Sequence, residues 1–214
     1  MFSSPLNLLL SGQFIPFLSF IIAIIVAITI HEFAHAYAAH KLGDRTPGDQ
    51  NRLSLNPIRH LDFLGSLLLV FIGFGWGKPV IFNPYNLKNQ KWGPAIIAIA
   101  GPLSNLILVI IFGLLLKFLG SAGVFTAASD PLLVLIQAFF VINIILMVFN
   151  LIPIPPLDGS KILYALVPGI TDETKVKLEQ YGPFALLALL FLGGGFISWL
   201  FNIVLSFFAI ILGL

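Results

Sequence analysis

The sequence predicts an all-α polytopic membrane protein with four to six transmembrane helices and a short re-entrant or β-like segment between the first and second long helices. Three observations predict this class. The composition is 58% hydrophobic and only 9% charged, whereas soluble domains carry roughly 25% charged residues. Four apolar runs reach the ~20 residues that cross a bilayer. A fifth, shorter run lies between the first two.

The four long runs follow one another along the chain. They are Phe14 to about Ala39, Trp92 to Leu116, Pro131 to Leu157, and Gln180 to Leu214. Gly101-Pro102 interrupts the second run, and a proline cluster ends the third. The fourth run contains Gly193-Gly194-Gly195, so it forms either one long tilted helix or a helix and a shorter segment.

The fifth run, from Phe63 to Gly77, is only 15 residues long and rich in glycine. This length favours a re-entrant or interfacial segment over a span. Seven of the eleven Lys and Arg residues lie in the two loops around it, residues 41–60 and 78–92. Positively charged loops remain cytoplasmic, so both loops are expected on the same side of the membrane. The second long helix then runs outward, and the third returns.

The rest of the composition limits what the protein contains. Nearly all of the 214 residues lie in apolar runs, so we expect residues 1–214 to form a single membrane-embedded domain. No cleaved signal is expected, because the apolar start has no basic residue and no small-residue cleavage site. The absence of cysteine leaves only His and carboxylates as metal ligands. The net charge of +2 gives no indication of a nucleic-acid partner.

The first run contains the most informative motif, His31-Glu32-Phe33-Ala34-His35. Residues four apart share one face of an α-helix, so His31 and His35 can bind one metal ion, with Glu32 placed to hold a water molecule. The alternative is a chance match, which this composition makes about a one-in-a-thousand event. A carboxylate at membrane depth also costs roughly 2.5 kcal/mol or more unless it lines a wet cavity. The motif therefore predicts a zinc site within the membrane.

A zinc site that performs chemistry has three protein ligands and an open position, so the two histidines need a partner. Most of the nine acidic residues lie in loops or polar segments. Asp158 differs, because it is embedded in an apolar run with prolines at positions 153, 155 and 156. Irregular backbone at membrane depth is tolerated only against protein or a water-filled cavity. A proline-terminated helix with a turn aspartate is the alternative, and Asp158 is the predicted third ligand.

The predicted topology brings these polar groups to one depth. His31 and His35 precede the cytoplasmic end of their helix by some five to nine residues, which places them roughly 8–13 Å deep. Asn105 lies a similar distance into the second long helix, and the third helix returns Asn150 and Asp158 to the same face. If the short run spanned the membrane instead, Asp158 would emerge on the opposite face.

Asn105 belongs to a second motif, Gly101-Pro102-Leu103-Ser104-Asn105. A proline kink and small residues that allow close helix packing give it a structural explanation. The functional interpretation is that Asn105 projects its amide into the cavity, and the residues alone support both equally. The remaining histidines, His40 and His60, are expected at the membrane interface, and neither completes a second metal site.

Together these motifs resemble the site-2 protease family of intramembrane zinc metalloproteases. The resemblance rests, in chain order, on His31-Glu32-x-x-His35, Gly101-Pro102-x-x-Asn105 and Asn150-x-x-Pro153-x-Pro155-Pro156-Leu157-Asp158-Gly159. The sequences Arg52-Leu53-Ser54-Leu55-Asn56-Pro57 and Trp76-Gly77-Lys78-Pro79-Val80 are also similar to those of compact bacterial and archaeal members. The expected form is a compact one, without the PDZ or CBS domains of larger relatives.

The resemblance implies one Zn²⁺ ion per chain, bound by His31, His35 and Asp158, with Glu32 as the catalytic base. The implied activity is hydrolysis of peptide bonds in or near transmembrane segments. The implied partners are therefore the lipid bilayer and a membrane-protein substrate, either a single-span protein or a cleaved stub. The implied location is the cell membrane, with the active site nearer the cytoplasmic face.

The resemblance also assigns substrate contacts. Asn105 and Asn150 are expected to position the substrate or the oxyanion.

A helical substrate must unwind before attack, and the run at 63–77 with the following Val80-Ile81-Phe82 is a candidate edge strand that holds it by β-addition.

Three alternatives remain open. A catalytically inactive relative with a binding or transport role would keep the fold without needing Glu32. A membrane metalloprotease that cuts soluble chains would need a later glutamate ligand, but Glu173 and Glu179 lie in a charged connector. A diiron oxygenase needs more than the four histidines present.

Overall fold

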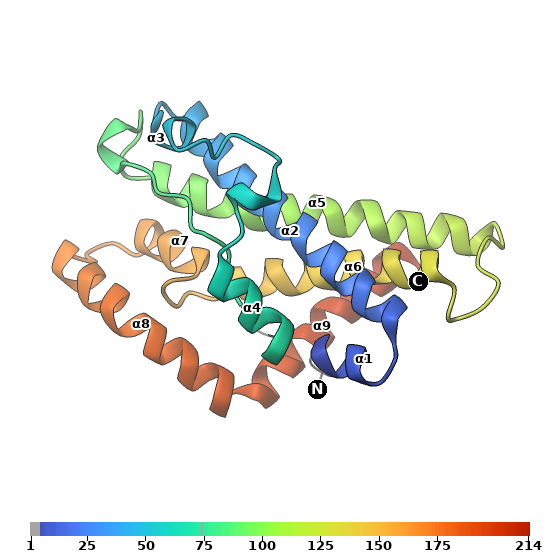
Figure 1. Ribbon diagram of the computed structural model, residues 1–214. Coiled ribbons are helices and arrows are strands. Elements are labelled where there is room, and N and C mark those ends of the chain that lie inside the picture. The colour runs from blue at the N-terminus through green and yellow to red at the C-terminus, as the bar shows by residue number, and fades with distance from the viewer. Residues whose placement is uncertain (1–4, 74) are drawn as a thin grey trace.

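A computed structural model describes residues 5–73 and 75–214, and the regular secondary structure of these residues is helical (Figure 1). The three longest helices are α2 (Phe14–Lys41), α5 (Gly93–Ser121) and α6 (Pro131–Asn150). The others are α1 (Pro5–Leu10), α3 (Thr46–Asp49), α4 (Phe63–Ile72), α7 (Asp158–Leu166), α8 (Asp172–Leu192) and α9 (Gly194–Leu212), with 3-10 turns η1 (Pro57–Arg59) and η2 (Pro84–Asn86). The predicted all-α class is confirmed.

Among the described helices, α2, α5, α6 and α9 are long and apolar enough to cross a membrane. The protein is therefore a multi-pass membrane protein. The third predicted run ends as a helix at Asn150 rather than Leu157, because the prolines that follow cannot continue it. The fourth run divides at Gly193 into α8 and α9, which selects the broken form over one long helix.

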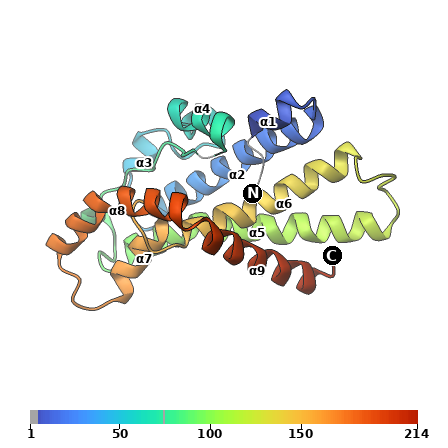
Figure 2. The ribbon, with the colours of Figure 1, turned by 90° about the horizontal axis from the view of Figure 1, so that it is seen from below.

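The helices α2, α5 and α6 pack against one another as a three-helix core (Figures 1 and 2). Ala23 and Ala27 of α2 are fully buried and let α6 approach closely, where Phe139 and Ile142 fill the contact. Phe112 of α5 stacks on Phe139 with ring centroids 4.3 Å apart. Small residues are common where membrane helices meet, because close backbone approach increases their packing contacts. Side chains of the three helices can therefore reach one another.

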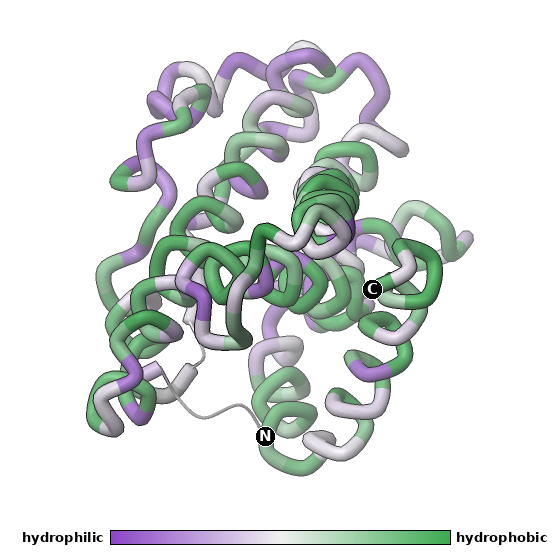
Figure 3. Tube along the Cα trace, turned by 90° about the vertical axis from the view of Figure 1, so that its right-hand side faces the viewer, coloured by the Kyte–Doolittle hydropathy of each residue, from purple (hydrophilic) through white to green (hydrophobic). Residues whose placement is uncertain are grey.

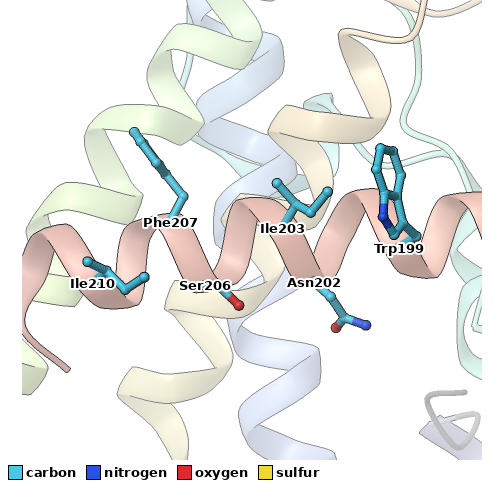
Figure 4. Close-up of a pocket in the computed structure, with 6 residues that line it drawn as sticks. All are labelled: Trp199, Asn202, Ile203, Ser206, Phe207 and Ile210. Carbon is cyan, nitrogen blue, oxygen red and sulfur yellow. The ribbon is translucent and has the colours of Figure 1, made fainter.

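The last helix, α9, packs one face on this core and exposes the other. Leu212 is buried against Val109 and Phe140. The opposite face has a shallow depression, which Figure 4 shows, lined by Trp199, Asn202, Ile203, Ser206, Phe207 and Ile210. Large exposed apolar side chains on a helix of this length are typical of a lipid-facing surface.

Hydrophilic residues gather at one end of the molecule, around α3 and the loop into α5 (Figure 3). Asp44 is fully buried there and accepts hydrogen bonds from Thr46, Asn83 and Asn86. Burial raises the pKa of Asp44, but these hydrogen bonds outweigh that effect and hold the pKa below its ordinary value. Asp44 therefore ties the loop after α2 to the segment before α5.

The short run between α2 and α5 forms α4 and an extended return. An isolated antiparallel bridge between Leu61 and Gly77 closes this excursion. Along α4, Phe63 and Phe71 are exposed, and the helix packs beside α1 (Figure 2). Such a short apolar helix is compatible with a re-entrant or interfacial segment, but its re-entry into the bilayer stays a prediction. Phe74, which belongs to this predicted run, lies outside the described residues.

Arg52 joins the two chain segments at the base of this excursion. Its side chain is only 3% exposed. The guanidinium donates to the backbone carbonyls of Arg59 and Lys78, and to that of Pro79 at 2.6 Å. Burial lowers the pKa of Arg52, and the nearby Glu32 carboxylate opposes that shift. Several carbonyl acceptors compensate the cost of burying this charge, so Arg52 fixes where the return begins.

One histidine of this region has surroundings that the sequence did not indicate. His60, expected at the membrane interface, is fully buried in the protein, where its Nε2 atom donates to the carbonyl oxygen of Ser54 at 2.6 Å. The carbonyl of His60 also accepts from the amide of Lys78 at 2.7 Å. The loop folds back over the ring because the two ends of the excursion meet there, which sequence spacing alone does not indicate.

Candidate metal centre

The helix α2 presents His31 and His35 from adjacent turns toward Asp158, the first residue of α7. The two Nε2 atoms are 3.0 Å apart, and each is 3.2 Å from Oδ2 of Asp158. Both histidines are buried, and Asp158 is partly buried. The structure thus brings together the three residues that the sequence predicts as metal ligands, with potential ligand atoms within 4.8 Å of one another.

The hydrogen bonds behind the two rings show that this donor set fits a metal cation. Nδ1 of His31 faces Oδ1 of Asn105 at 2.5 Å, and Nδ1 of His35 faces the carbonyl oxygen of Ile97 at 2.7 Å. Oxygen acceptors at these positions require a proton on each Nδ1 atom. In neutral rings, both Nε2 lone pairs then face the Asp158 carboxylate, an arrangement that a cation stabilises. Zinc bonds of 2.0–2.1 Å in a tetrahedron separate ligand atoms by about 3.3 Å, close to the separations here.

Gly101 of α5 lies directly against the two imidazoles. A Cβ atom on this residue would lie 2.5 Å from Nε2 of both His31 and His35. Any other amino acid would therefore enter the position where the ligand atoms converge. The small residue serves helix packing and the site together, so the structural and functional explanations of this motif are not exclusive.

Asp158 reaches the site because the chain after α6 does not continue as a helix. Residues 151–157 form turns, with a cis peptide bond between Pro155 and Pro156, and α7 then begins at Asp158. A carboxylate in the first turn of a helix also interacts favourably with the helix dipole. The predicted unwinding of the proline-rich stretch is present in the structure.

Glu32 follows His31 in α2 and is half-buried. It faces the return from α4, because a Cβ atom on Gly77 would lie 3.4 Å from Oε1 of Glu32 and 3.1 Å from a methyl group of Ile28. Glu32 therefore lies beside the start of the extended segment, one residue after His31 in the same helix. A carboxylate at this position can accept a proton from a water molecule near the ligand atoms.

The two predicted asparagines have different surroundings. Asn105 is fully buried, and both its amide atoms are engaged, Oδ1 with His31 and Nδ2 with Oδ1 of Asn143 at 2.8 Å. Asn150 is half-buried at the end of α6, where Nδ2 donates to the carbonyl of Leu146 at 3.0 Å. The described structure gives it no hydrogen bond to the three predicted ligands. The substrate roles of both residues stay predictions.

Asn143 is a site residue that sequence reasoning missed. It is fully buried in α6 and contacts Asn105 from the side opposite His31. The available signal was an uncharged amide within the apolar run Pro131–Leu157, because polar groups inside membrane helices usually have a specific partner. Spacing along the chain does not indicate which residue it meets.

Comparison with known proteins finds relatives that are named as zinc metalloproteases. The model of a family described as Peptidase family M50 matches residues 122–193, which include Asp158. The chain is 40% identical to "Putative zinc metalloprotease YwhC" of Bacillus subtilis, over 84% of this chain and 83% of that protein. No solved structure matches the chain significantly.

More distant relatives have similar names. The chain is 30% identical to "Putative zinc metalloprotease Rip2" of Mycolicibacterium smegmatis, over 86% of this chain and 70% of that protein. It is 29% identical to "Zinc metalloprotease MJ0392" of Methanocaldococcus jannaschii, over 79% of this chain but only 41% of that longer protein. The similarity therefore extends over most of the chain and includes two bacterial proteins and one archaeal protein.

Proposed function

The chain belongs to peptidase family M50, the site-2 protease family, and from that premise we propose that it is an intramembrane zinc metalloprotease. Its substrates are membrane proteins, single-span chains or cleaved stubs, cut in or near their transmembrane segments. The observation that carries the proposal is the set of ligand atoms of His31, His35 and Asp158, which converge inside a bundle of apolar helices. A water-using site at this position suits a substrate that is itself in the membrane.

The proposed chemistry divides the work among four residues. His31, His35 and Asp158 would hold one Zn²⁺ ion, which when bound would supply Lewis acidity and lower the pKa of water. Glu32 accepts the proton of the attacking water and then passes it to the leaving amine. Because Glu32 is adjacent to His31 in α2, the same helix fixes both the ligands and the base.

Asn150 is the better candidate for the oxyanion. Its Nδ2 atom has two hydrogens and makes one hydrogen bond within the described structure, to Leu146, so one hydrogen remains for a substrate oxygen. Asn105 is fully buried with its carbonyl oxygen facing His31. We therefore assign the substrate contact to Asn150.

The extended segment after α4 is the proposed substrate strand. Within the described residues, the backbone N–H groups of Val80, Ile81 and Phe82 make no hydrogen bond, whereas that of Asn83 is bound by Asp44 at 2.7 Å. An unpaired edge can add an extended peptide through main-chain hydrogen bonds. Arg52 holds the other end of this segment near Glu32. A substrate paired here would lie unwound beside the base.

The proposed location is the cell membrane, with the site nearer the cytoplasmic face. The basic loops 41–60 and 78–92 support this orientation, because positively charged loops stay in the cytoplasm. Both loops belong to the hydrophilic end of the molecule (Figure 3).

The proposal is tested with purified protein and a panel of single-span substrates, comparing wild type with Glu32→Gln. The amide that replaces the carboxylate cannot accept a proton, so we expect cleavage to fall by ~100-fold or more while bound zinc stays equal to wild type. Zinc is quantified in both proteins, and products are identified by mass spectrometry. Zinc binding without Glu32-dependent product from any substrate would instead favour a catalytically inactive relative with a binding or transport role.

A further inference from the structure

We propose that Asn143 of α6 is a positioning residue that acts through Asn105 to keep the proton of His31 on Nδ1 and leave Nε2 free to bind the metal. The inference rests on the metal site of the proposed function but not on peptide cleavage. It goes beyond the ligand set because neither asparagine touches the metal position.

Three buried side chains connect α6 to α2 through α5. Nδ2 of Asn143 donates to the main-chain carbonyl of Phe139 at 2.8 Å. Oδ1 of Asn143 accepts from Nδ2 of Asn105 at 2.8 Å, and Oδ1 of Asn105 lies 2.5 Å from Nδ1 of His31. Both asparagines are 0% exposed, and His31 is 5% exposed. Each hydrogen bond thus lies away from solvent.

The direction of every hydrogen bond in this relay follows from its first member. The carbonyl of Phe139 can only accept, so Asn143 must turn its amino group toward it. The carbonyl oxygen of Asn143 then faces Asn105, which must donate to it and turn its own oxygen toward His31. That oxygen requires a proton on Nδ1 of His31, which in the neutral ring leaves a lone pair on Nε2. A main-chain carbonyl on α6 therefore sets the protonation pattern of a ligand on α2.

Reversal of either amide would place two donors or two acceptors in contact. An unpaired buried polar group is costly because no water replaces the lost partner. This cost gives the relay one favourable arrangement, whereas an isolated asparagine beside His31 could present either end of its amide.

His35 provides an internal comparison. Its Nδ1 atom faces the main-chain carbonyl of Ile97 directly, at 2.7 Å, without an intervening side chain. The two ligands thus reach the same protonation pattern by different routes. Loss of Asn143 should therefore change the position of the ring proton in His31 and leave that of His35 unchanged.

A double-mutant cycle with Asn105→Leu, Asn143→Leu and the combined variant tests whether Asn143 acts through Asn105. Loss of an outer partner of a metal-bound histidine typically weakens metal binding ~10–100-fold, which we expect for Asn105→Leu. The loss of one hydrogen bond corresponds to about a five-fold change in an equilibrium constant, so we expect Asn143→Leu to weaken zinc binding about five-fold. The combined variant should match Asn105→Leu alone, because the second substitution then has nothing left to position. Zinc affinity is measured by competition with a chelator.

The second readout is the Nδ1 proton of each histidine, observed by ¹⁵N NMR in metal-free and zinc-loaded protein. Wild type should show a proton on Nδ1 of both His31 and His35. Asn143→Leu should introduce a second population or rapid proton exchange at His31 only. A residue with only a general structural role would not single out one of the two rings. This measurement also tests the inference when no substrate is cleaved, a result that would remove the proposed peptidase activity alone.

Asn202→Leu is the matched control, because Asn202 is exposed on α9 and outside the core (Figure 4). It should leave zinc affinity and both Nδ1 protons unchanged. If Asn143→Leu does not fold, Asn143→Ala replaces it in the same cycle. Additive losses of zinc affinity in the cycle, or an Nδ1 proton of His31 that does not respond to either asparagine variant, would overturn the inference.

Discussion

The metal centre and the extended segment beside it differ in how completely their polar groups are paired. At the centre, the Nδ1 atoms of His31 and His35 each face an oxygen acceptor, and Asn105 uses both ends of its amide. In the segment, the described backbone N–H groups of Val80, Ile81 and Phe82 have none. The first region is suited to holding fixed geometry, and the second has hydrogen-bonding groups available for a second chain.

Under the proposed function, this difference would let the protein combine chemistry with adaptable recognition. A metal site needs ligands held within narrow limits, so its supporting hydrogen bonds must be satisfied by the protein itself. A segment that accepts varied substrates would need unpaired main-chain groups, because main-chain pairing reads no particular side chain. Damage to the first region should abolish metal binding, whereas damage to the second should spare it.

The largest effect is expected for Gly101→Ala. The new methyl group would lie 2.5 Å from Nε2 of both His31 and His35, so zinc affinity should fall by more than the ~100-fold limit for losing an outer partner. The matched control is Gly120→Ala in the same helix, whose Cβ would meet nothing within 4 Å. Bound zinc and thermal unfolding are measured for both variants. Full zinc content in Gly101→Ala would show that the centre is not fixed as described.

Proline at Val80 or Ile81 should have an intermediate effect, confined to the substrate. Proline fits extended backbone but removes a donor, so cleavage should fall about ten-fold while zinc content stays at the wild-type level. Ile81→Ala is the control, because it shortens an exposed side chain and keeps the N–H group. Initial cleavage rates are compared at low substrate concentration. Unchanged cleavage in both proline variants would remove the proposed strand addition.

Asp44→Asn should have the smallest effect on zinc binding and cleavage. Its effect on the stability of the fold should depend on pH. The folded protein lowers the pKa of Asp44, so the carboxylate stabilises the fold at neutral pH, and this contribution disappears as pH falls through the folded pKa. We expect the variant to be less stable by about 1–3 kcal/mol at pH 7, and equal to wild type in strong acid. Thermal unfolding across this pH range measures the difference. Asp49→Asn, which replaces an exposed acid in the same region, is the control and should leave the stability at pH 7 unchanged.

The sequence predicts the helical class and the residues of the candidate centre because both depend on short-range patterns. The spacing of His31 and His35 follows directly from helix geometry. Asp158 is identifiable because an acid within an apolar run needs a reason to be there. These arguments use residue identity and position within one element, which the sequence states explicitly.

Contacts between elements are harder to predict from the sequence. Asn143 meets Asn105 only because α5 and α6 pack in a particular rotation, and several rotations satisfy the same hydropathy. His60 was expected at an interface because its neighbours are polar, yet the closure of the α4 excursion buries it. The predicted run contains the end of α6 but did not locate it. The prolines show that the helix must stop without specifying its last residue.

The separation of the ligands along the chain has a consequence for biosynthesis. His31 and Asp158 are 127 residues apart. At about 5–20 residues per second, a ribosome needs roughly 6–25 s to add the last ligand after the first. During that interval α2 exists without Asp158, so a nascent chain cannot assemble the proposed centre. The order of synthesis would therefore delay the proposed cleavage activity until the third long helix has been made.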